Sequence, residues 1–477
     1  MIRIQITEYD YRHDLYALVR EFYPGTEVTT EILPPEDNDF VRLLFCDGPE
    51  SGKSRQSRVI LLPDAKACMD RLDRKNYIKR CVFEALRDDT GKEPPWGTLT
   101  GIRPVKLALA MMEDGRSNEE ISTYFHDEFE TGNDKISLVT EIAEREKKLL
   151  SKIAYRGGYS IYIGIPFCPT RCLYCSFTSY PISLWQSRVD EYLEALFKEI
   201  DYVSSKMKDH ALQTIYIGGG TPTTLTASQL DRLITKLESA FSFESLLEFT
   251  VEAGRPDSIT EDKLQVLRHH RIARISINPQ TMQQKTLDLI GRKHTVQDTA
   301  DAFHMARELG FTNINMDVIV GLPGETKIDV EDTMQKIREL GPDSLTVHSL
   351  AIKRAARLNT DWAQYAAYKI TNTAEIIDMT ARYAREMELY PYYLYRQKNM
   401  AGNFENVGYA KVDKAGIYNI LIMEEKQSIV ALGAGGSTKL CIPEENRIER
   451  IENVKDVGEY ISRIDEMIKR KGDRICR

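Results

Sequence analysis

Three cysteines, Cys168, Cys172 and Cys175, stand at a Cys-x3-Cys-x2-Cys spacing within one short stretch of the chain. They follow the apolar run 161–165, which has the length and composition of a buried strand, and precede the aromatic Phe177. Iron–sulfur clusters are usually held by four cysteine thiolates, so three in one loop predict a cluster with one iron left open to an exchangeable ligand. The fold must therefore present a tight loop at the end of a buried strand.

Structural zinc is the alternative interpretation of this group. Zinc sites combine Cys-x2-Cys with a distant second pair of Cys or His, whereas the remaining cysteines are scattered without such a pair, at 46, 68, 81, 441 and 476. With its preceding strand and following aromatic residue, the motif resembles that of the radical S-adenosylmethionine (SAM) enzymes. This resemblance implies a 4Fe–4S cluster whose open iron is chelated by the amine and carboxylate of SAM.

Length and charge limit the remaining possibilities. A chain of 477 residues with 42% apolar content is expected to form two or three domains. Its start has no signal-peptide pattern and no apolar run approaches the roughly 20 residues that span a bilayer, so we expect a cytoplasmic protein without a membrane span. The net charge of −8 disfavours nucleic acid as a partner but is compatible with a compact anionic small molecule, since salt screens charges beyond roughly 10 Å.

Residues 1–154 are predicted to form an N-terminal α+β accessory domain without a catalytic constellation. Apolar runs with strand character occupy 2–6, 27–33, 41–46 and 59–62. Helical patterns follow at 70–89, 104–112, 118–125 and 135–153.

From 155 to 350, short apolar strands alternate with helical stretches. The strands are expected at 161–165, 214–218, 247–252, 273–277, 313–319 and 344–348, and the helices at 184–206, 227–240, 260–269, 296–309 and 327–340. Six such units predict an α/β fold, a partial (β/α)6 barrel of the radical SAM type rather than a doubly wound sheet. The active site of such a barrel lies at the carboxyl ends of its strands.

Residues 351–477 are predicted to form a C-terminal α+β cap on the substrate side of the barrel. It is expected to contain a long helix over 362–387, two strand-like runs within 416–431 and a helix over 454–471. The closing residues 469–477 are interpreted as a solvated tail.

Polar and glycine residues follow several of the predicted barrel strands. The glycine turn 218–222 lets backbone groups approach a ligand closely. Glu252, Gln280 and Asp317 are suited to ribose hydroxyls, and Arg292 to a carboxylate. Each of them also has a structural interpretation as a satisfied polar residue of the barrel, and this applies most strongly to His294.

Five stretches are similar to the oxygen-independent coproporphyrinogen III oxidases, also called coproporphyrinogen dehydrogenases: 162–168, 219–224, 274–280, 315–323 and 432–437. The resemblance covers roughly 155–440, and the extra N-terminal domain looks like that of the HemZ branch. It implies oxidative decarboxylation of two propionates of coproporphyrinogen III to vinyls in haem biosynthesis. It also implies that Cys168, Cys172 and Cys175 hold the cluster, and that the residues around SAM are Tyr162, Gly219, Gly220, Thr221, Glu252, Gln280, Arg292 and Asp317.

The chain departs from this family at two positions beside the cysteines. Gly164 stands where the oxidases commonly have histidine, and Phe177 where they have a fourth cysteine; the Phe variant is also found in relatives that act as haem chaperones. Two alternatives therefore stay open: a haem-binding trafficking protein, and a different radical reaction on a tetrapyrrole.

The expected partners are a tetrapyrrole and an electron donor such as flavodoxin or ferredoxin. Basic residues are candidates for the carboxylates of the tetrapyrrole and are otherwise a solvated face: Lys353, Arg354, Arg357, Arg396 and Lys398.

Overall fold

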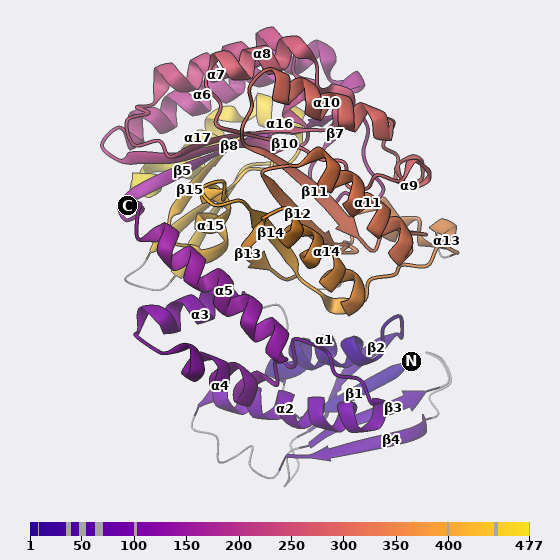
Figure 1. The fold of residues 1–477 in the computed structure, drawn as a ribbon. Helices are drawn as coiled ribbons and strands as arrows, with labels where there is room; N and C mark the ends of the chain where they lie inside the picture. The colour runs from indigo at the N-terminus through magenta and orange to yellow at the C-terminus, as the bar shows by residue number, and fades with distance from the viewer. Residues whose placement is uncertain are drawn as a thin grey trace. The chain divides into compact units, whose positions relative to one another are not determined.

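Figure 1 shows the computed structural model of the chain, which describes residues 1–7, 9–34, 40–46, 54–62, 70–99, 103–365, 367–397, 400–442 and 447–476. The chain divides into two compact units. The first contains Met1–Glu144 together with a short segment that includes Arg396, and the second contains the rest of the chain. Lys398 and Cys68 lie outside the described residues.

The first unit contains a four-stranded sheet in the order β2-β1-β3-β4. Its strands are β1 (Ile2–Ile6), β2 (Val28–Ile32), β3 (Phe40–Cys46) and β4 (Ser54–Leu61). Alternate residues of β1 are buried against the helices α1 (Arg12–Phe22) and α2 (Arg71–Thr90), whose apolar faces complete this core. The helices α3 (Pro104–Glu113) and α4 (Asn118–Phe129) follow, and α5 (Asn133–Leu150) begins in this unit and ends beyond Glu144. The helix α1 has no counterpart among the predicted elements.

The second unit is built on an eleven-stranded sheet in the order β13-β14-β12-β11-β10-β9-β8-β5-β15-β16-β17. Its six central strands run parallel and match the six predicted ones: β5 (Gly158–Ile165), β8 (Ala211–Gly219), β9 (Glu248–Gly254), β10 (Arg274–Ile277), β11 (Ile314–Val320) and β12 (Ser344–Ser349). The predicted α/β fold with six βα units is therefore confirmed.

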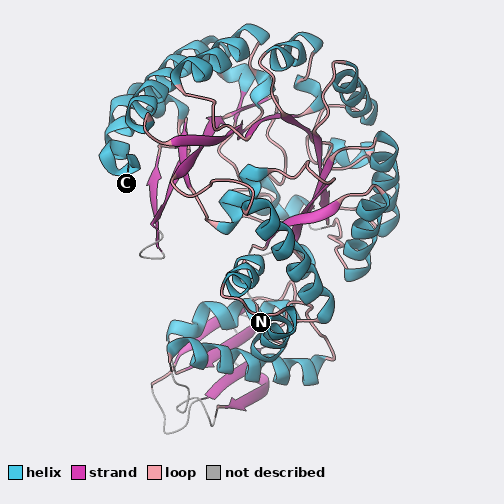
Figure 2. Cartoon of the chain, turned by 60° about the vertical axis from the view of Figure 1, so that its left-hand side comes forward, coloured by secondary structure: helices cyan, strands magenta, loops and turns pink. Residues whose placement is uncertain are grey.

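Helices cover the outer side of this curved sheet, as Figure 2 shows. They are α6 (Val189–Met207), α7 (Ala227–Ala240), α8 (Glu261–His269), α9 (Gln284–Leu289), α10 (Val296–Glu308) and α11 (Lys327–Leu340). In β5, Ile161, Ile163 and Ile165 are fully buried, while Tyr162 and Gly164 lie on the opposite, inner face. The inner faces of the strands are thus free to carry polar and aromatic residues.

Strands from the C-terminal part of the chain extend both edges of the six parallel strands. At one edge, β14 (Asn406–Ala410) pairs antiparallel with β12 and with β13 (Tyr390–Tyr395). At the other, β15 (Ser428–Leu432) lies parallel to β5 and is followed by the antiparallel β16 (Ser437–Ile442) and β17 (Arg447–Glu452). The first strand of the barrel is therefore sandwiched between β8 and a strand more than 260 residues away in the sequence.

Three details of this C-terminal part differ from the sequence-based expectation. The long helix over 362–387 is replaced by α13 (Trp362–Tyr365) and α14 (Ala374–Glu386), because Thr373 caps α14 and the Asn372 amide donates to Ser349 Oγ instead of continuing a helix. The first strand-like run forms the helix α15 (Ile417–Glu424). The closing residues are not a solvated tail, since Lys471 at the end of α17 (Ile464–Lys471) is fully buried.

Two further helices, α12 (Arg357–Thr360) and α16 (Val457–Ser462), and the short strands β6 (Phe167–Cys168) and β7 (Tyr180–Pro181) complete the unit. Among the described residues, no helix combines the length and the apolar character needed to cross a membrane.

Candidate active site

The three cysteines lie in a loop that leaves the carboxyl end of β5 through β6. Two other parts of the chain hold this loop by hydrogen bonds. The Leu173 amide donates to Ile290 O at 2.9 Å, the Leu358 amide donates to Leu173 O at 2.9 Å, and Thr170 Oγ1 donates to Gly291 O at 2.8 Å. The loop is therefore fixed between the end of β5, the connection from α9 to α10 and the segment that follows β12.

The glycine turn after β8 packs directly against the start of the cysteine loop. The Gly220 amide donates to Ile165 O at 2.8 Å and the Thr221 amide to Phe167 O at 2.7 Å. The Thr221 hydroxyl reaches Cys168 Sγ at 3.6 Å. A Cβ atom at Gly220 would lie only 2.5 Å from Phe167 O, so this close approach requires glycine.

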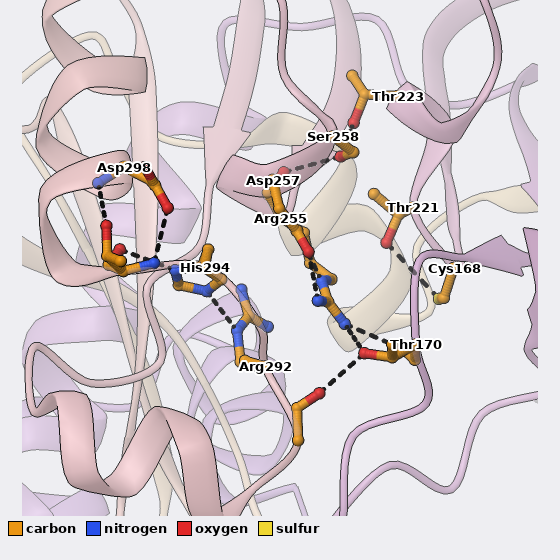
Figure 3. Close-up of polar contacts among 12 residues, drawn as sticks. Cys168, Thr170, Thr221, Thr223, Arg255, Asp257, Ser258, Arg292, His294 and Asp298 are labelled. Atoms are coloured by element: carbon orange, nitrogen blue, oxygen red, sulfur yellow. Dashed lines mark hydrogen bonds and ion pairs between the residues drawn. The ribbon is translucent and has the colours of Figure 1, made fainter.

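Arg255, just beyond the end of β9, is a residue that the sequence analysis did not single out. Its guanidinium is buried and forms a two-pronged ion pair with Asp257, at 2.9 and 2.6 Å. The same side chain donates to Thr170 O at 3.0 Å and to Thr170 Oγ1 at 2.6 Å, as Figure 3 shows. The sequence offers one signal for Arg255, namely its position directly after a buried strand that ends in glycine. This position alone does not reveal that the side chain contacts the cysteine loop.

Arg292 and His294 lie on another side of the cysteine loop. The Arg292 guanidinium is buried, donates to His294 Nε2 at 2.9 Å and also donates to Asn278 O. Burial, reinforced by the Arg292 cation, lowers the pKa of His294 to about 4, so this imidazole is neutral and accepts the arginine hydrogen bond. The contacts of His294 favour the structural interpretation of this residue.

Tyr162 and Glu252 lie on the inner face of the sheet. The Tyr162 ring stacks on that of Tyr216, with centroids 6.2 Å apart, and Tyr216 stacks in turn on Tyr418 at 4.6 Å. The Tyr216 hydroxyl donates to Glu252 Oε1. Burial raises the pKa of Glu252 to about 7 in spite of this hydrogen bond, so its carboxyl exchanges a proton near neutral pH.

Asp317 lies two strands further along the same face and has the opposite electrostatic character. Burial alone would raise its pKa, but the neighbouring imidazole of His348 and a hydrogen bond from Asn315 outweigh this effect and hold the pKa below its ordinary value. The Asn315 amide lies 2.8 Å from Asp317 Oδ1, and His348 Nε2 lies 3.8 Å from Oδ2. Asp317 is therefore an anion over the physiological pH range.

Gln280 is joined to the end of β11 through its backbone. Its amide donates to Asp317 O and its carbonyl accepts from the Ile319 amide, both at 2.9 Å. Its φ of 67° places it in the left-handed region, which is uncommon for a residue other than glycine and tends to occur at functional sites. Of the residues expected around SAM, Gly219, Gly220 and Thr221 lie at the end of β8 or directly after it, and Gln280 follows β10. Tyr162, Glu252 and Asp317 lie within β5, β9 and β11, and Arg292 lies in the connection from α9 to α10.

The donor set around the cysteine loop fits an iron–sulfur cluster. The thiols lie close enough to influence one another: burial raises the pKa of Cys168 to about 11, and its neighbours Cys175 and Cys172 add to the effect. In addition, Asn278 Oδ1 at the end of β10 is buried without a hydrogen-bond partner in the structure. In the described part of the chain, no three His, Cys, Asp or Glu side chains converge as ligands of a single metal ion. The ligands of a cluster bind different irons and need a wider spacing.

The basic residues proposed for the substrate separate into two groups. Arg354 and Arg357 are exposed beside the cysteine loop, where Ala355 O accepts from Arg171 at 2.9 Å. Arg396 instead belongs to the first unit, where its guanidinium stacks on Trp96 at 4.9 Å and donates to Leu99 O.

A cavity of about 510 Å³ lies at the amino ends of β9 and β10, and Phe249 and His270 are among the residues that line it. The cysteines lie beyond the opposite, carboxyl ends of the parallel strands.

Comparison with known proteins shows what the chain is similar to. Residues 162–337 match the Radical SAM superfamily. The oxygen-independent coproporphyrinogen-III oxidase-like protein HemZ of Bacillus subtilis (strain 168) is 40% identical over 395 residues, which cover 82% of this chain and 79% of that protein. The solved structure of coproporphyrinogen III oxidase (HemN) from Escherichia coli, described as a radical SAM enzyme, shares the fold at 23% identity with a TM-score of 0.52, over 68% of this chain and 73% of that one.

Two further kinds of relative match a shorter region. The heme chaperone HemW of Bacillus subtilis (strain 168) is 40% identical over 195 residues, 41% of this chain and 51% of HemW. The oxygen-independent coproporphyrinogen III oxidase of Salmonella typhimurium is 33% identical over 192 residues, 40% of this chain and 42% of that enzyme. The chain thus matches about half the length of these relatives, one of which is named a chaperone and the other an oxidase.

Replacing Gly220 with alanine is expected to destabilise the second unit by about 1–3 kcal/mol, because the new Cβ overlaps the carbonyls of Phe167 and Ile165. Gly164→Ala is the matched control, since its Cβ would lie no closer than 3.3 Å to Leu432 O. Urea unfolding of both variants measures the difference. Equal free energies of unfolding would contradict the close packing of the glycine turn.

Glu252→Gln is expected to change how stability depends on pH. The pKa of Glu252 is raised from 4.5 to about 7 on folding, so its stabilising contribution is complete below about pH 4.5 and is lost as pH rises through 7. Because the side chain is only partly buried, we expect the free energy of unfolding of the wild type to fall by about 2 kcal/mol relative to the variant between pH 5 and pH 8. Urea titrations at four pH values measure this, and parallel curves for the two proteins would exclude it.

Proposed function

The chain belongs to the family of oxygen-independent coproporphyrinogen-III oxidase-like radical SAM proteins, and from this premise we propose that it decarboxylates two propionates of coproporphyrinogen III to vinyls, giving protoporphyrinogen IX. The family implies a 4Fe–4S cluster and SAM. The observation that supports the proposal most is the direct contact between the cysteine loop and the glycine turn, through Thr221 and Cys168. It brings one proposed cluster ligand next to one proposed SAM residue.

In this proposal Cys168, Cys172 and Cys175 hold the cluster and leave one iron for SAM. When bound, cluster and SAM supply a 5′-deoxyadenosyl radical that takes a hydrogen atom from the β carbon of a propionate, after which carbon dioxide and one electron leave. Thr221 donates a hydrogen bond to the Cys168 sulfur, and Arg255 holds Thr170 in the loop. Both contacts orient the cysteine loop before any ligand arrives.

The polar residues of the inner face are proposed to position SAM and to keep water away from it. Glu252, neutral below about pH 7, and the anionic Asp317 offer hydrogen bonds to ribose hydroxyls. Tyr162 and Tyr216 form an apolar wall beside them. Such a wall suits radical chemistry, because a reactive species in a water-excluded site meets only its intended target.

The proposed partners outside the chain are a tetrapyrrole with several carboxylates and a reducing protein such as flavodoxin or ferredoxin. The exposed Arg354 and Arg357 lie beside the cysteine loop and are candidates for a propionate. The electron released with each carbon dioxide passes to an acceptor outside the chain.

A haem-binding chaperone is the second candidate, and two observations favour it. Phe177, at the position where the oxidases commonly have a fourth cysteine, is 70% exposed at the rim of the cysteine loop. In addition, HemW and HemZ are equally similar to this chain: each is 40% identical to it, HemW over 195 residues and HemZ over 395 residues. This candidate requires stoichiometric haem binding without release of carbon dioxide.

Anaerobic incubation of the reconstituted protein with SAM, a reductant and coproporphyrinogen III is expected to release two carbon dioxide molecules per protoporphyrinogen IX formed. Mass spectrometry of the tetrapyrroles and of 5′-deoxyadenosine measures this outcome. Cleavage of SAM without loss of carboxyl groups would favour a different radical reaction on a tetrapyrrole. Tight binding of haem without either change would favour the chaperone.

Cys172→Ala is expected to lower the iron content from about four atoms per chain to less than one, because the loop then has too few thiolates to hold a cluster. Cys441→Ala is the matched control, as this thiol lies on β16 and donates to Gln427 O at 3.2 Å. Iron and sulfide analysis after anaerobic reconstitution measures both variants. A full iron content in Cys172→Ala would remove this cysteine from the ligand set.

A further inference from the structure

A fully buried ion pair joins the end of α17 to the middle of α6. Lys471 Nζ lies 2.6 Å from Glu199 Oε1, and neither side chain is exposed to solvent. The carboxylate also accepts hydrogen bonds from Asn453 Nδ2 at 2.8 Å, the Gly433 amide at 2.8 Å and the Tyr460 hydroxyl at 2.5 Å. Burying two charges is costly unless their hydrogen bonds are satisfied, and here the carboxylate has four donors.

The hydrogen bonds of this cluster converge on the loop 433–436, which we call the glycine loop. Glu199 binds the Gly433 amide, and Asn453 Nδ2 donates to Gly433 O at 2.9 Å. Two backbone hydrogen bonds also hold this loop, from the Asn453 amide to Gly436 O at 2.9 Å and from the Gly435 amide to Val454 O at 2.8 Å. The glycine loop is thus fixed from one side by charged and polar groups.

The other side of the glycine loop touches the elements that carry the candidate site. The Tyr192 hydroxyl donates to Gly164 O at 2.5 Å and accepts from the Ala434 amide at 3.1 Å, so it links the loop to the end of β5. A Cβ atom on Gly433 would lie 2.5 Å from Gly164 O, and one on Gly435 would lie 3.3 Å from Thr178 Oγ1. Thr178 is three residues beyond Cys175.

We propose that Glu199 and Lys471 are positioning residues for the SAM site: they hold the glycine loop in register with the end of β5 and with the cysteine loop. The inference rests on the SAM site of the proposed function and not on its substrate. An apolar pair of similar volume would fill the same space and is often at least as stabilising, but it offers no acceptor for the Gly433 amide. A directional, charged acceptor therefore fixes where this backbone lies.

The test compares three variants with the wild type. Lys471→Met removes the cation and leaves the Glu199 carboxylate buried without its counter-ion, so its melting temperature is expected to fall. Glu199→Leu combined with Lys471→Met removes both charges and the acceptor of the Gly433 amide, and is expected to recover part of the melting temperature. Lys469→Met, an exposed lysine of the same helix, is the matched control.

The affinity for SAM separates positioning from simple stability. After anaerobic reconstitution with equal iron content, we expect the SAM dissociation constant to rise about tenfold in both Lys471→Met and the double variant, and to stay unchanged in Lys469→Met. The change of the cluster's paramagnetic spectrum on addition of SAM measures it. A double variant with the melting temperature and the SAM affinity of the wild type would overturn the proposal.

Tyr460→Phe provides an independent measurement if the charge variants do not fold. It removes one donor to Glu199 without leaving an unpaired charge. In the protein without cluster or SAM, hydrogen–deuterium exchange of the amides of residues 433–436 is expected to accelerate, because the Gly433 amide loses a firmly held acceptor. Unchanged exchange at these amides, together with unchanged SAM affinity, would refute the positioning role. A wild type that binds no SAM at all would instead contradict the proposed function itself.

Discussion

Two backbone hydrogen bonds, from Gly220 to Ile165 and from Thr221 to Phe167, are the constraint on which the candidate site depends. They join the ends of β5 and β8 at the point where the cysteine loop begins, and they are possible only because residue 220 has no side chain. Without this contact the Thr221 hydroxyl would not reach the Cys168 sulfur. The remaining hydrogen bonds of the cysteine loop involve Arg255 and the carbonyls of Ile290 and Gly291. They hold the rest of the loop in place after its start has been positioned by the glycine turn.

The two carboxyls of the inner face show how one environment produces two kinds of acid. Both Glu252 and Asp317 are partly removed from water, which by itself favours the neutral form. Asp317 accepts a hydrogen bond from Asn315, lies near the imidazole of His348 and stays ionised. The principal partner of Glu252 is a tyrosine hydroxyl, which compensates the loss of hydration less well. The same face therefore offers a fixed anion and a group that changes its charge near neutrality.

The parts of the fold that could be predicted from sequence are those with local signals. The six parallel strands were predicted because buried strands such as β5 and β11 are mostly apolar runs between helical patterns. The helix α1 was missed, and the run that forms α15 was taken for a strand, since short apolar segments are ambiguous between the two states. The roles of Arg255 and Lys471 could not be predicted, because each depends on a partner far away in the sequence, Thr170 and Glu199. The cysteines were found because their spacing is itself the signal.

The position of β15 beside β5 has a consequence for the order in which the protein is made. The chain leaves the ribosome with β5 and the cysteines early, but the strand that covers the open edge of β5 follows some 270 residues later, and Lys471 later still. During most of translation the nascent chain therefore exposes an unpaired strand edge next to three free thiols. The edge of β5 beside the cysteine loop is therefore covered only after the C-terminal strand β15 has been made.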